Sequence, residues 1–526
     1  MFSSTKDNAL LAMIRDGREM SGSQKLNLIV QLSVPSILAQ LTTIMMFYID
    51  ASMVGSLGAE ASASIGIVES TTWLFGGLTS AAALGFSVQA AHFIGANDFD
   101  KARQVFRQGL MATALFTIIL TSVCVAIAGP LPRWLGGDAS IQADASSYFM
   151  IYCLALPVYQ IGVLSSSMLK CSGNMRIPSL TSILMCVLDV VFNFFLIYET
   201  RHVSLFGIGI TMPGAGMGVS GAALGTALAY TVTGVLQTWF ATVRSPELSL
   251  RNGKWTFAPQ WNYLRNAARI SLPMGAQYMM MSGAQIVSTM IVAPLGNIAI
   301  AANTLAITAE SLCYMPGYGI GEAATTLVGQ SIGAGRQRLA RGFAYRTVFL
   351  GMGVMAFMGA VMYVLAPEMI AIMTPDEQVR LLGSQSLRIE AFAEPMFAAS
   401  IVVYSVCLGA GDTFVPACMN FASMWLLRLT LVAWLAPVYG LAGRMARPGV
   451  RPARRMDGNG NRADVPRNDI PCPPVQGQMA EQGVQVRVGN IFCKIYYKQR
   501  SRGLPHGHGT YSMLRQPPAP SLRVVT

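Results

Sequence analysis

The sequence predicts an all-α polytopic membrane protein, in which two pseudo-symmetric helical lobes surround a central cavity. Hydrophobic residues fill 53% of its 526 positions, charged residues fill only 12%, and the mean hydropathy is +0.47. Soluble domains carry about twice that share of charge. Uncharged stretches recur that are long enough to cross a bilayer, which takes about 20 helical residues. The chain also repeats itself, and the repeat predicts the two lobes.

The repeat relates residues 35–103 to residues 273–341 at a constant offset of 238 positions. Chance apolar similarity would give scattered identities at drifting offsets, whereas here prolines, glycines and arginines stay in one register. We interpret the pattern as a duplicated half, so each copy predicts the fold of the other. The landmarks are Pro35/Pro273, Val54/Val292, Leu57-Gly58/Leu295-Gly296, Ile94-Gly95-Ala96/Ile332-Gly333-Ala334, Ala102-Arg103/Ala340-Arg341, Pro157/Pro395, Gly173/Gly411 and Pro178/Pro416.

Eleven apolar spans are visible in the sequence, whereas a duplicated six-helix unit would give 6 + 6. An even number of helices per unit leaves both halves facing the same way, which predicts a symmetry axis along the membrane normal. The expected spans lie near 27–50, 61–92, 108–130, 146–169, 177–198 and 219–243, then near 266–293, 297–330, 346–366, 384–408 and 414–437.

Lysines and arginines in the loops predict the orientation, because cytoplasmic loops are enriched in them. The loops that follow the second, fourth, sixth and eighth spans are basic, and the alternate loops are mixed or acidic. We therefore expect a multi-pass protein of the plasma or inner membrane with a cytoplasmic N-terminus. The basic loops contain Lys101, Arg103, Arg107, Lys170, Arg176, Arg244, Arg251, Lys254, Arg265, Arg336, Arg338 and Arg341.

These features divide the chain into five parts. They are a cytoplasmic N-terminal tail (1–25), an N-terminal six-helix lobe (26–245), a cytoplasmic linker (246–263), a C-terminal lobe with five visible spans (264–443) and a basic tail (444–526). The first part lacks the short apolar region and cleavage site of a signal peptide.

The last part departs from the repeat. Gly440 and Gly443 match Gly218 and Gly221 at the start of span six, but the chain then turns rich in Arg, Pro, Gly and Gln, with 14 Lys+Arg against 4 Asp+Glu. Three interpretations compete: a tail that binds nucleic acid or anionic lipid, a disordered extension without function, and a change of reading frame that removed the twelfth helix. We favour the third, because the composition changes abruptly within a repeat unit, and we expect no nucleic-acid partner.

Several motifs together resemble those of multidrug and toxic compound extrusion (MATE) transporters, over roughly residues 27–443. The resemblance implies twelve helices in two six-helix lobes around a cavity that opens alternately to each side. It also implies efflux of organic cations or other amphiphiles, driven by entry of H+ or Na+. The motifs are Pro35 with Ile49-Asp50 and Val54-Gly55-Ser56-Leu57-Gly58, Gly95-Ala96-Asn97-Asp98, Gly218-Val219-Ser220-Gly221-Ala222-Ala223, Met315-Pro316-Gly317, Leu327-Val328-Gly329-Gln330-Ser331-Ile332-Gly333-Ala334-Gly335 and Gly409-Ala410-Gly411-Asp412-Thr413.

Polar residues within the spans are the candidate site, because a carboxylate in hydrocarbon is costly and therefore usually functional. Asp50 ends the first span, and its repeat partner is Ser288. Asp189 and Asn193 share one face of the fifth span, and their repeat partners are leucines. The shared fold therefore does not require these polar residues. A water-exposed helix end is the alternative for Asp50, and a structural pairing with Arg428 is the alternative for Asp189.

The MATE resemblance implies that Asp50, Asp189, Asn193 and Thr226 form a cation or proton site. The order here is Asp then Asn along the fifth span, whereas some members of that family have the reverse. Burial favours the protonated form of a carboxyl group, and a nearby cation favours the ionised form. Protons and cations can then compete for one acid, which would couple their movements.

Four further acids within the spans are candidates for the substrate cavity, where they would attract a cation: Glu69, Glu310, Glu322 and Glu394. The acid that some MATE branches carry in the seventh span has no obvious counterpart here, where Gln277 and Met279-Met280-Met281 lie. This argues against coupling through the C-terminal lobe.

Enzyme chemistry finds no support in the sequence, which has no Ser/His or Cys/His catalytic arrangement, no metal-ligand spacing and no nucleotide loop. We predict a secondary antiporter without a cofactor that exchanges an amphiphilic or cationic small molecule for H+ or Na+ and contacts membrane lipid. The alternatives are a flippase for a lipid-linked or polysaccharide precursor, a membrane-embedded enzyme, and an inactive truncated transporter. The sequence leaves the substrate, the coupling ion and the oligomeric state open.

Overall fold

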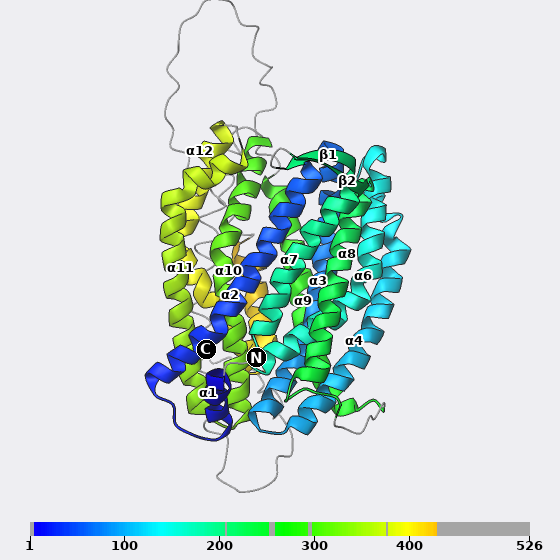
Figure 1. The fold of residues 1–526 in the computed structure, drawn as a ribbon. Helices are drawn as coiled ribbons and strands as arrows, with labels where there is room; N and C mark the ends of the chain where they lie inside the picture. Colours follow the sequence, from blue (N-terminus) through cyan, green and yellow to red (C-terminus); the bar gives the residue numbers. More distant parts are fainter. Residues whose placement is uncertain (1–4, 206–207, 252–257, 293–296, 375–376, 429–526) are drawn as a thin grey trace, which may run out of the picture.

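The computed structural model describes residues 5–205, 208–251, 258–292, 297–374 and 377–428, and it is a bundle of long helices (Figure 1). This confirms the predicted all-α class. The helices are α1 Thr5–Arg15, α2 Gly22–Gly55, α3 Ala59–Gly95, α4 Phe99–Ala128, α5 Leu131–Trp134, α6 Ala139–Cys171, α7 Arg176–Ile197, α8 Gly218–Trp239, η1 Phe240–Arg244, α9 Trp261–Val292, α10 Asn297–Gly333, α11 Gln337–Met373, α12 Glu377–Ala391, α13 Glu394–Gly409, α14 Phe414–Phe421 and η3 Ala422–Arg428, and the strands are β1 Glu199–Leu205 and β2 Ile208–Ala215.

Seven of the described helices are long and apolar enough to cross a membrane, and the α12–α13 pair would make an eighth. Helices α9 and α10, of 32 and 37 residues, lie in the same bundle (Figure 1). The eleventh expected span begins with α14 and extends beyond the described residues. The position expected for a twelfth span and the basic tail also lie outside the described residues.

Polar caps make the helices longer than the apolar spans that predict them. The Ser21 hydroxyl accepts a hydrogen bond from the Gln24 amide, and the Gln24 side chain accepts one from the Ser21 amide, so a capping box begins α2. Asp98 accepts a hydrogen bond from the Lys101 amide at the start of α4. The helices therefore begin several residues before their hydrocarbon-length stretches.

The tenth predicted span, 384–408, is not one straight helix. It comprises α12 and α13, which meet at an angle of 58°. Pro395 lies in the first turn of α13. Proline lacks the amide hydrogen that would continue α12, and it disfavours helical geometry at the residue before it. A hydropathy window averages over this break, because the two helices taken together are apolar enough to form one membrane span.

A β-hairpin joins α7 to α8, where the sequence predicts only a loop. Its strands pair antiparallel, with Glu199 opposite Ala215 and Arg201 opposite Met212. The segment is rich in Thr, Val and Ile, which favour strands. Figure 1 shows the hairpin and the start of α12 at one end of the bundle and α1 at the other. We call these the hairpin end and the α1 end.

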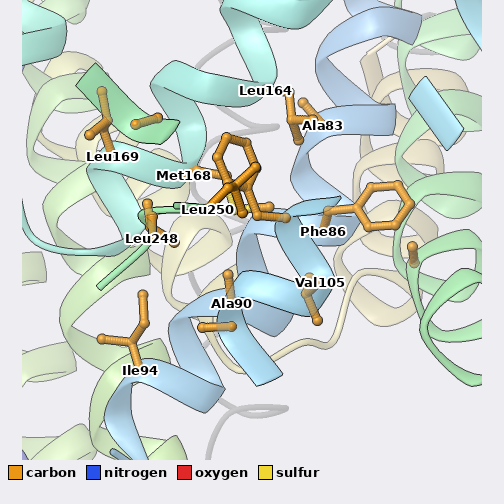
Figure 2. Close-up of a cluster of buried hydrophobic side chains, with 14 of the residues drawn as sticks. Ala83, Phe86, Ala90, Ile94, Val105, Leu164, Met168, Leu169, Leu248 and Leu250 are labelled. Carbon is orange, nitrogen blue, oxygen red and sulfur yellow. The ribbon is translucent and has the colours of Figure 1, made fainter. Parts of the chain in front are cut away.

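Buried apolar side chains join the helices of the N-terminal lobe near the α1 end. Figure 2 shows this cluster, in which Phe86 and Val105 lie near Leu164 and Met168, from helices α3, α4 and α6. Leu248 and Leu250 belong to the same cluster and are at most 2% exposed. The predicted cytoplasmic linker (246–263) therefore begins as part of the hydrophobic core.

Helix α1 lies within the predicted N-terminal tail and contacts both lobes. Leu11 and Ile14 are buried against α2, α10 and α11. Arg15 forms an ion pair with Glu247 at 3.6 Å, and Arg336 donates a hydrogen bond to the Met13 carbonyl at 2.9 Å. Charged residues on the rest of this segment lower its mean hydropathy, so composition alone does not predict its apolar face.

The two lobes meet backbone to backbone at the α1 end, where α3 crosses α10. A Cβ atom added to Gly95 would lie 2.1 Å from the Gln330 carbonyl oxygen, and one added to Gly333 would lie 2.0 Å from the His92 carbonyl oxygen. The Gln330 side chain also donates a hydrogen bond to the Cys171 carbonyl at 2.7 Å. These contacts form a seal that only glycine permits at its two closest points.

Candidate functional site

Two helices of the N-terminal lobe place three polar side chains in contact within the bundle. Asp50 lies in the last two turns of α2, and Asp189 and Asn193 lie one turn apart on α7. The Asn193 amide donates hydrogen bonds to Asp50 Oδ1 at 2.9 Å and to Asp189 Oδ2 at 3.2 Å. Asp189 and Asn193 are 0% exposed, whereas Asp50 is partly exposed. The amide therefore bridges two carboxyl groups.

Helix α8 completes this cluster. A Cβ atom on Gly225 would lie 2.1 Å from Asn193 Oδ1, so a glycine at this position lets α8 approach α7 closely. Thr226 donates a hydrogen bond to the Ala222 carbonyl of its own helix, and its side chain also interacts with the Asp189 carboxyl. The structure thus brings together all four residues singled out in the sequence, and their part in ion coupling stays a prediction.

The cluster has more acceptors than donors. Asp189 Oδ1 and Asn193 Oδ1 are buried and make no hydrogen bond within the described part of the chain. Burying such groups without a partner is costly. A proton on one carboxyl, or a small cation among the oxygens, would supply the missing partner. The arrangement is therefore suited to binding H+ or Na+.

The side chains of the repeat partners of these residues, and that of the arginine considered as a partner of Asp189, fall outside the described part of the chain. The side chains of Ser288, Leu427 and Arg428 lie outside the described residues, and so does Leu431.

Two tyrosines that the sequence analysis did not single out lie near the cluster. Tyr148 on α6 interacts electrostatically with Asp50, Asp189 and Glu69. Tyr230 on α8 interacts with Asp50 and Asp189 and also lines the central cavity. No local sequence signal marks these tyrosines, because only the packing of α6 and α8 against α2 and α7 brings them close.

The central cavity has a volume of about 950 Å³ and lies between the lobes, lined by residues of α2, α3, α6, α7, α8, α9 and α10. Its charged lining residues are Glu69, Lys170 and Glu322. Aromatic side chains surround them, which is a lining that suits organic cations. These are Phe47, Tyr48, Trp73, Tyr159, Tyr230, Tyr278, Tyr314 and Tyr318.

The other two acids proposed for the cavity, Glu310 and Glu394, are not among the residues that line it. They are 7% and 1% exposed, within the C-terminal lobe. An acid within an apolar span predicts burial, but the sequence does not show which face of the helix meets the cavity. Glu394 lies at the bend between α12 and α13, where its helix face is turned into the lobe.

The MatE family model matches residues 35–195 and 273–434. The chain belongs to the MatE family. This is a family of multidrug efflux transporters, and the chain is accordingly a multi-pass membrane transporter. The two matched segments start 238 residues apart, at the offset of the sequence repeat. They include Asp50, Asp189 and Asn193 in the first segment and Glu310, Glu322 and Glu394 in the second.

Curated relatives of this MatE chain include two multidrug resistance proteins. The probable multidrug resistance protein NorM of Thermotoga maritima is 24% identical over 406 residues, which cover 76% of this chain and 83% of the relative. The multidrug resistance protein MdtK of Yersinia pestis is 23% identical over 429 residues, which cover 79% of this chain and 90% of the relative.

Solved structures show that the chain shares the MatE fold. A MATE transporter of the MOP superfamily in an outward-facing conformation matches with a TM-score of 0.78 at 18% identity, over 94% of this chain and 100% of that one. A MOP superfamily transporter of Pyrococcus furiosus, described as having a binding pocket of reverse polarity, matches with a TM-score of 0.76 at 18% identity, over 93% and 98%.

Replacing Glu69 with glutamine is expected to weaken binding of cationic dyes to this MatE chain modestly. Glu69 is exposed in the cavity and accepts one long hydrogen bond, from Trp73 at 3.4 Å. Exposed charge interactions are worth about 0.2–1 kcal/mol, which corresponds to a loss of up to about fivefold in affinity. Dye titration of the purified protein measures the affinity. The control is Glu60→Gln, because Glu60 lies at the start of α3 and outside the cavity. Unchanged binding of every cationic dye would remove Glu69 from the substrate site.

Proposed function

We propose that this MatE protein is a secondary antiporter that exports cationic or amphiphilic small molecules in exchange for H+ or Na+ by alternating access. The observation that carries the proposal is the buried cluster of Asp50, Asp189 and Asn193, with unpartnered oxygens, beside a cavity that also contains carboxylates. The cluster would hold the coupling ion, and the cavity would hold the substrate.

Coupling would follow from Tyr230 and α2, which contribute to both sites. Tyr230 lines the cavity and interacts with both acids of the cluster, and Ala51, next to Asp50, lines the cavity as well. A change of charge at Asp50 or Asp189 would therefore alter the electrostatic potential in the cavity over a short distance and in a medium of low dielectric constant. Binding of the ion and binding of the substrate could then exclude one another, so that ion entry would promote substrate release.

The lining of the cavity supports the proposal that the substrate is a cation. Two of its three charged lining residues are acids, and its walls are aromatic. The relatives are named multidrug resistance proteins, which supports small molecules of varied shape. A flippase for an anionic lipid-linked precursor would be favoured by a basic cavity, which is not the balance of charge observed here.

The basic loops support one membrane orientation. We place the α1 end in the cytoplasm of a cell whose plasma or inner membrane holds the protein, because Lys101, Arg103, Lys170, Arg336 and the start of the linker lie at that end. The seal of α3 against α10 would then close the cytoplasmic side, and the conformation would be the one that releases substrate outward.

Reconstitution into liposomes tests the proposal. We expect the protein to move a cationic dye such as rhodamine 6G against its gradient when a pH gradient or a Na+ gradient is imposed, without ATP. An ionophore that collapses the effective gradient should stop the movement, and protein-free liposomes provide the background. Dye movement that ignored both gradients would overturn antiport.

A further inference from the structure

A charged pair joins the two lobes at the side of the cavity nearest the α1 end. Lys170, in the last turn of α6, belongs to the N-terminal lobe, and Glu322 on α10 belongs to the C-terminal lobe. Lys170 Nζ lies 2.6 Å from Glu322 Oε1. Gln40 on α2 donates a hydrogen bond to the same oxygen at 3.1 Å. Glu322 therefore receives two donors, one of them charged, from the opposite lobe.

Both charged side chains face the cavity rather than the outer surface. Lys170, Glu322 and Gln40 all line it, and the two charged side chains are 23% and 25% exposed. Glu322 Oε2 makes no hydrogen bond among the described residues. This oxygen is buried, so in the closed arrangement the carboxylate is held by Lys170 and Gln40 through its other oxygen alone.

The pair lies beside other contacts that join the two lobes near the α1 end. The Lys170 carbonyl accepts a hydrogen bond from Thr326 at 3.1 Å, and the next carbonyl, of Cys171, accepts one from Gln330 at 2.7 Å. Thr326 and Gln330 follow Glu322 on α10 by one and two turns, toward the seal. Separation of α6 from α10 at this end would break these bonds and remove Lys170 from Glu322.

We propose that Glu322 binds the positive charge of the substrate and that Lys170 is the built-in competitor that displaces it. This rests on the proposed function of the chain as a cation exporter. When the α1 end is open, Glu322 is free to accept a substrate cation. When that end closes, Lys170 returns to Glu322, the substrate loses its counter-charge, and it leaves the cavity.

A tethered amine is an effective competitor, because a group held near its partner by a short linkage acts at a local concentration of about the millimolar range or above. Partial exposure keeps the pair reversible, since ion pairs in contact with water are weak. Lys170 also neutralises the Glu322 carboxylate whenever no substrate occupies the cavity.

The test is dye binding by the purified full-length protein, with rhodamine 6G as the cation and Nile red as the neutral probe. Lys170→Met keeps the length and helix preference of the side chain and removes its charge. We expect this variant to bind rhodamine 6G about tenfold more tightly than the wild type and Nile red equally well. In liposomes the same variant should show a lower KM and a lower maximal rate, because the undisplaced dye leaves slowly.

Three variants control the experiment. Lys170→Arg keeps the charge and should bind the dye like the wild type. Lys101→Met removes another ion-paired lysine, exposed on α4 away from the cavity, and should change nothing. Glu322→Gln should weaken binding of rhodamine 6G, and Lys170→Met should give no gain when it is combined with Glu322→Gln.

Either of two results would overturn the inference: Lys170→Met that binds rhodamine 6G no more tightly than the wild type, or the same gain in the Glu322→Gln background. The proposed function is judged separately, by gradient-driven transport. A protein that shows the predicted pattern of dye affinities and yet moves no dye would retain the competition and refute the antiporter.

Discussion

Asp50→Asn is expected to abolish gradient-driven export while leaving the protein folded in the membrane. In the wild type, the Asn193 amide donates a hydrogen bond to Asp50 Oδ1 at 2.9 Å. An asparagine at position 50 keeps an oxygen that can accept this bond, but it cannot gain or lose a proton. A tenfold gradient of either coupling ion supplies about 1.4 kcal/mol per ion. Each coupled ion that is lost should therefore lower the dye accumulation ratio about tenfold in such a gradient.

Transport in liposomes measures this effect, and Asp144→Asn is the matched control. Asp144 is an exposed acid on α6 near the hairpin end, so its loss should leave the accumulation ratio at the wild-type level. Membrane insertion and thermal unfolding report whether the Asp50 variant is folded. Normal accumulation of dye by Asp50→Asn would remove this residue from the coupling mechanism.

Gly95→Ala is expected to open the α1 end. The added Cβ would lie 2.1–2.8 Å from the backbone of Gln330, and backbone atoms cannot rotate away as a side chain can. Overpacking of this kind costs about 1–3 kcal/mol, which exceeds the gain of up to about 1 kcal/mol from replacing a helical glycine by alanine. The gain is smaller still at the last residue of α3. We expect the sealed state to lose about tenfold in population and export to slow accordingly.

The thiol of Cys171 reports on this opening, because it lies beside the seal and is 4% exposed. Mass spectrometry of the Cys171 peptide after brief treatment with a maleimide should show faster labelling in Gly95→Ala than in the wild type. Gly66→Ala is the control on the same helix, since a Cβ there meets nothing within 4 Å. Equal labelling of all three proteins would show that the lobes tolerate the extra methyl group.

Hydropathy and helix periodicity predicted the helical class and the pairing of Asp189 with Asn193, because both depend on local spacing. The repeat added Asp50, whose partner Ser288 showed that the fold does not need an acid there. Contacts between distant helices could not be predicted in this way. The Lys170–Glu322 pair joins positions 152 residues apart, and neither residue alone differs from an ordinary loop lysine or span acid.

The remaining differences have local causes that composition obscures. Pro395 breaks a stretch that passes as one membrane span when α12 and α13 are averaged together, so a hydropathy window does not show the bend. Leu11 and Ile14 lie among charged residues, which lowers the average hydropathy of α1 although one face of it is buried. Glu394 shows the converse, since a charged residue in an apolar span is turned away from the cavity.

The seal at the α1 end has the form of a contact between two identical subunits. Gly95 of the first repeat touches Gln330 of the second, and Gly333 touches His92; in the repeat register Gly95 corresponds to Gly333 and His92 to Gln330. Reciprocal contacts of this kind define an isologous, two-fold interface. One surface, written twice in a single chain, therefore supplies both sides of the seal. A homodimer of the six-helix unit before its duplication would have closed through the same two glycines, related by a two-fold axis passing between them.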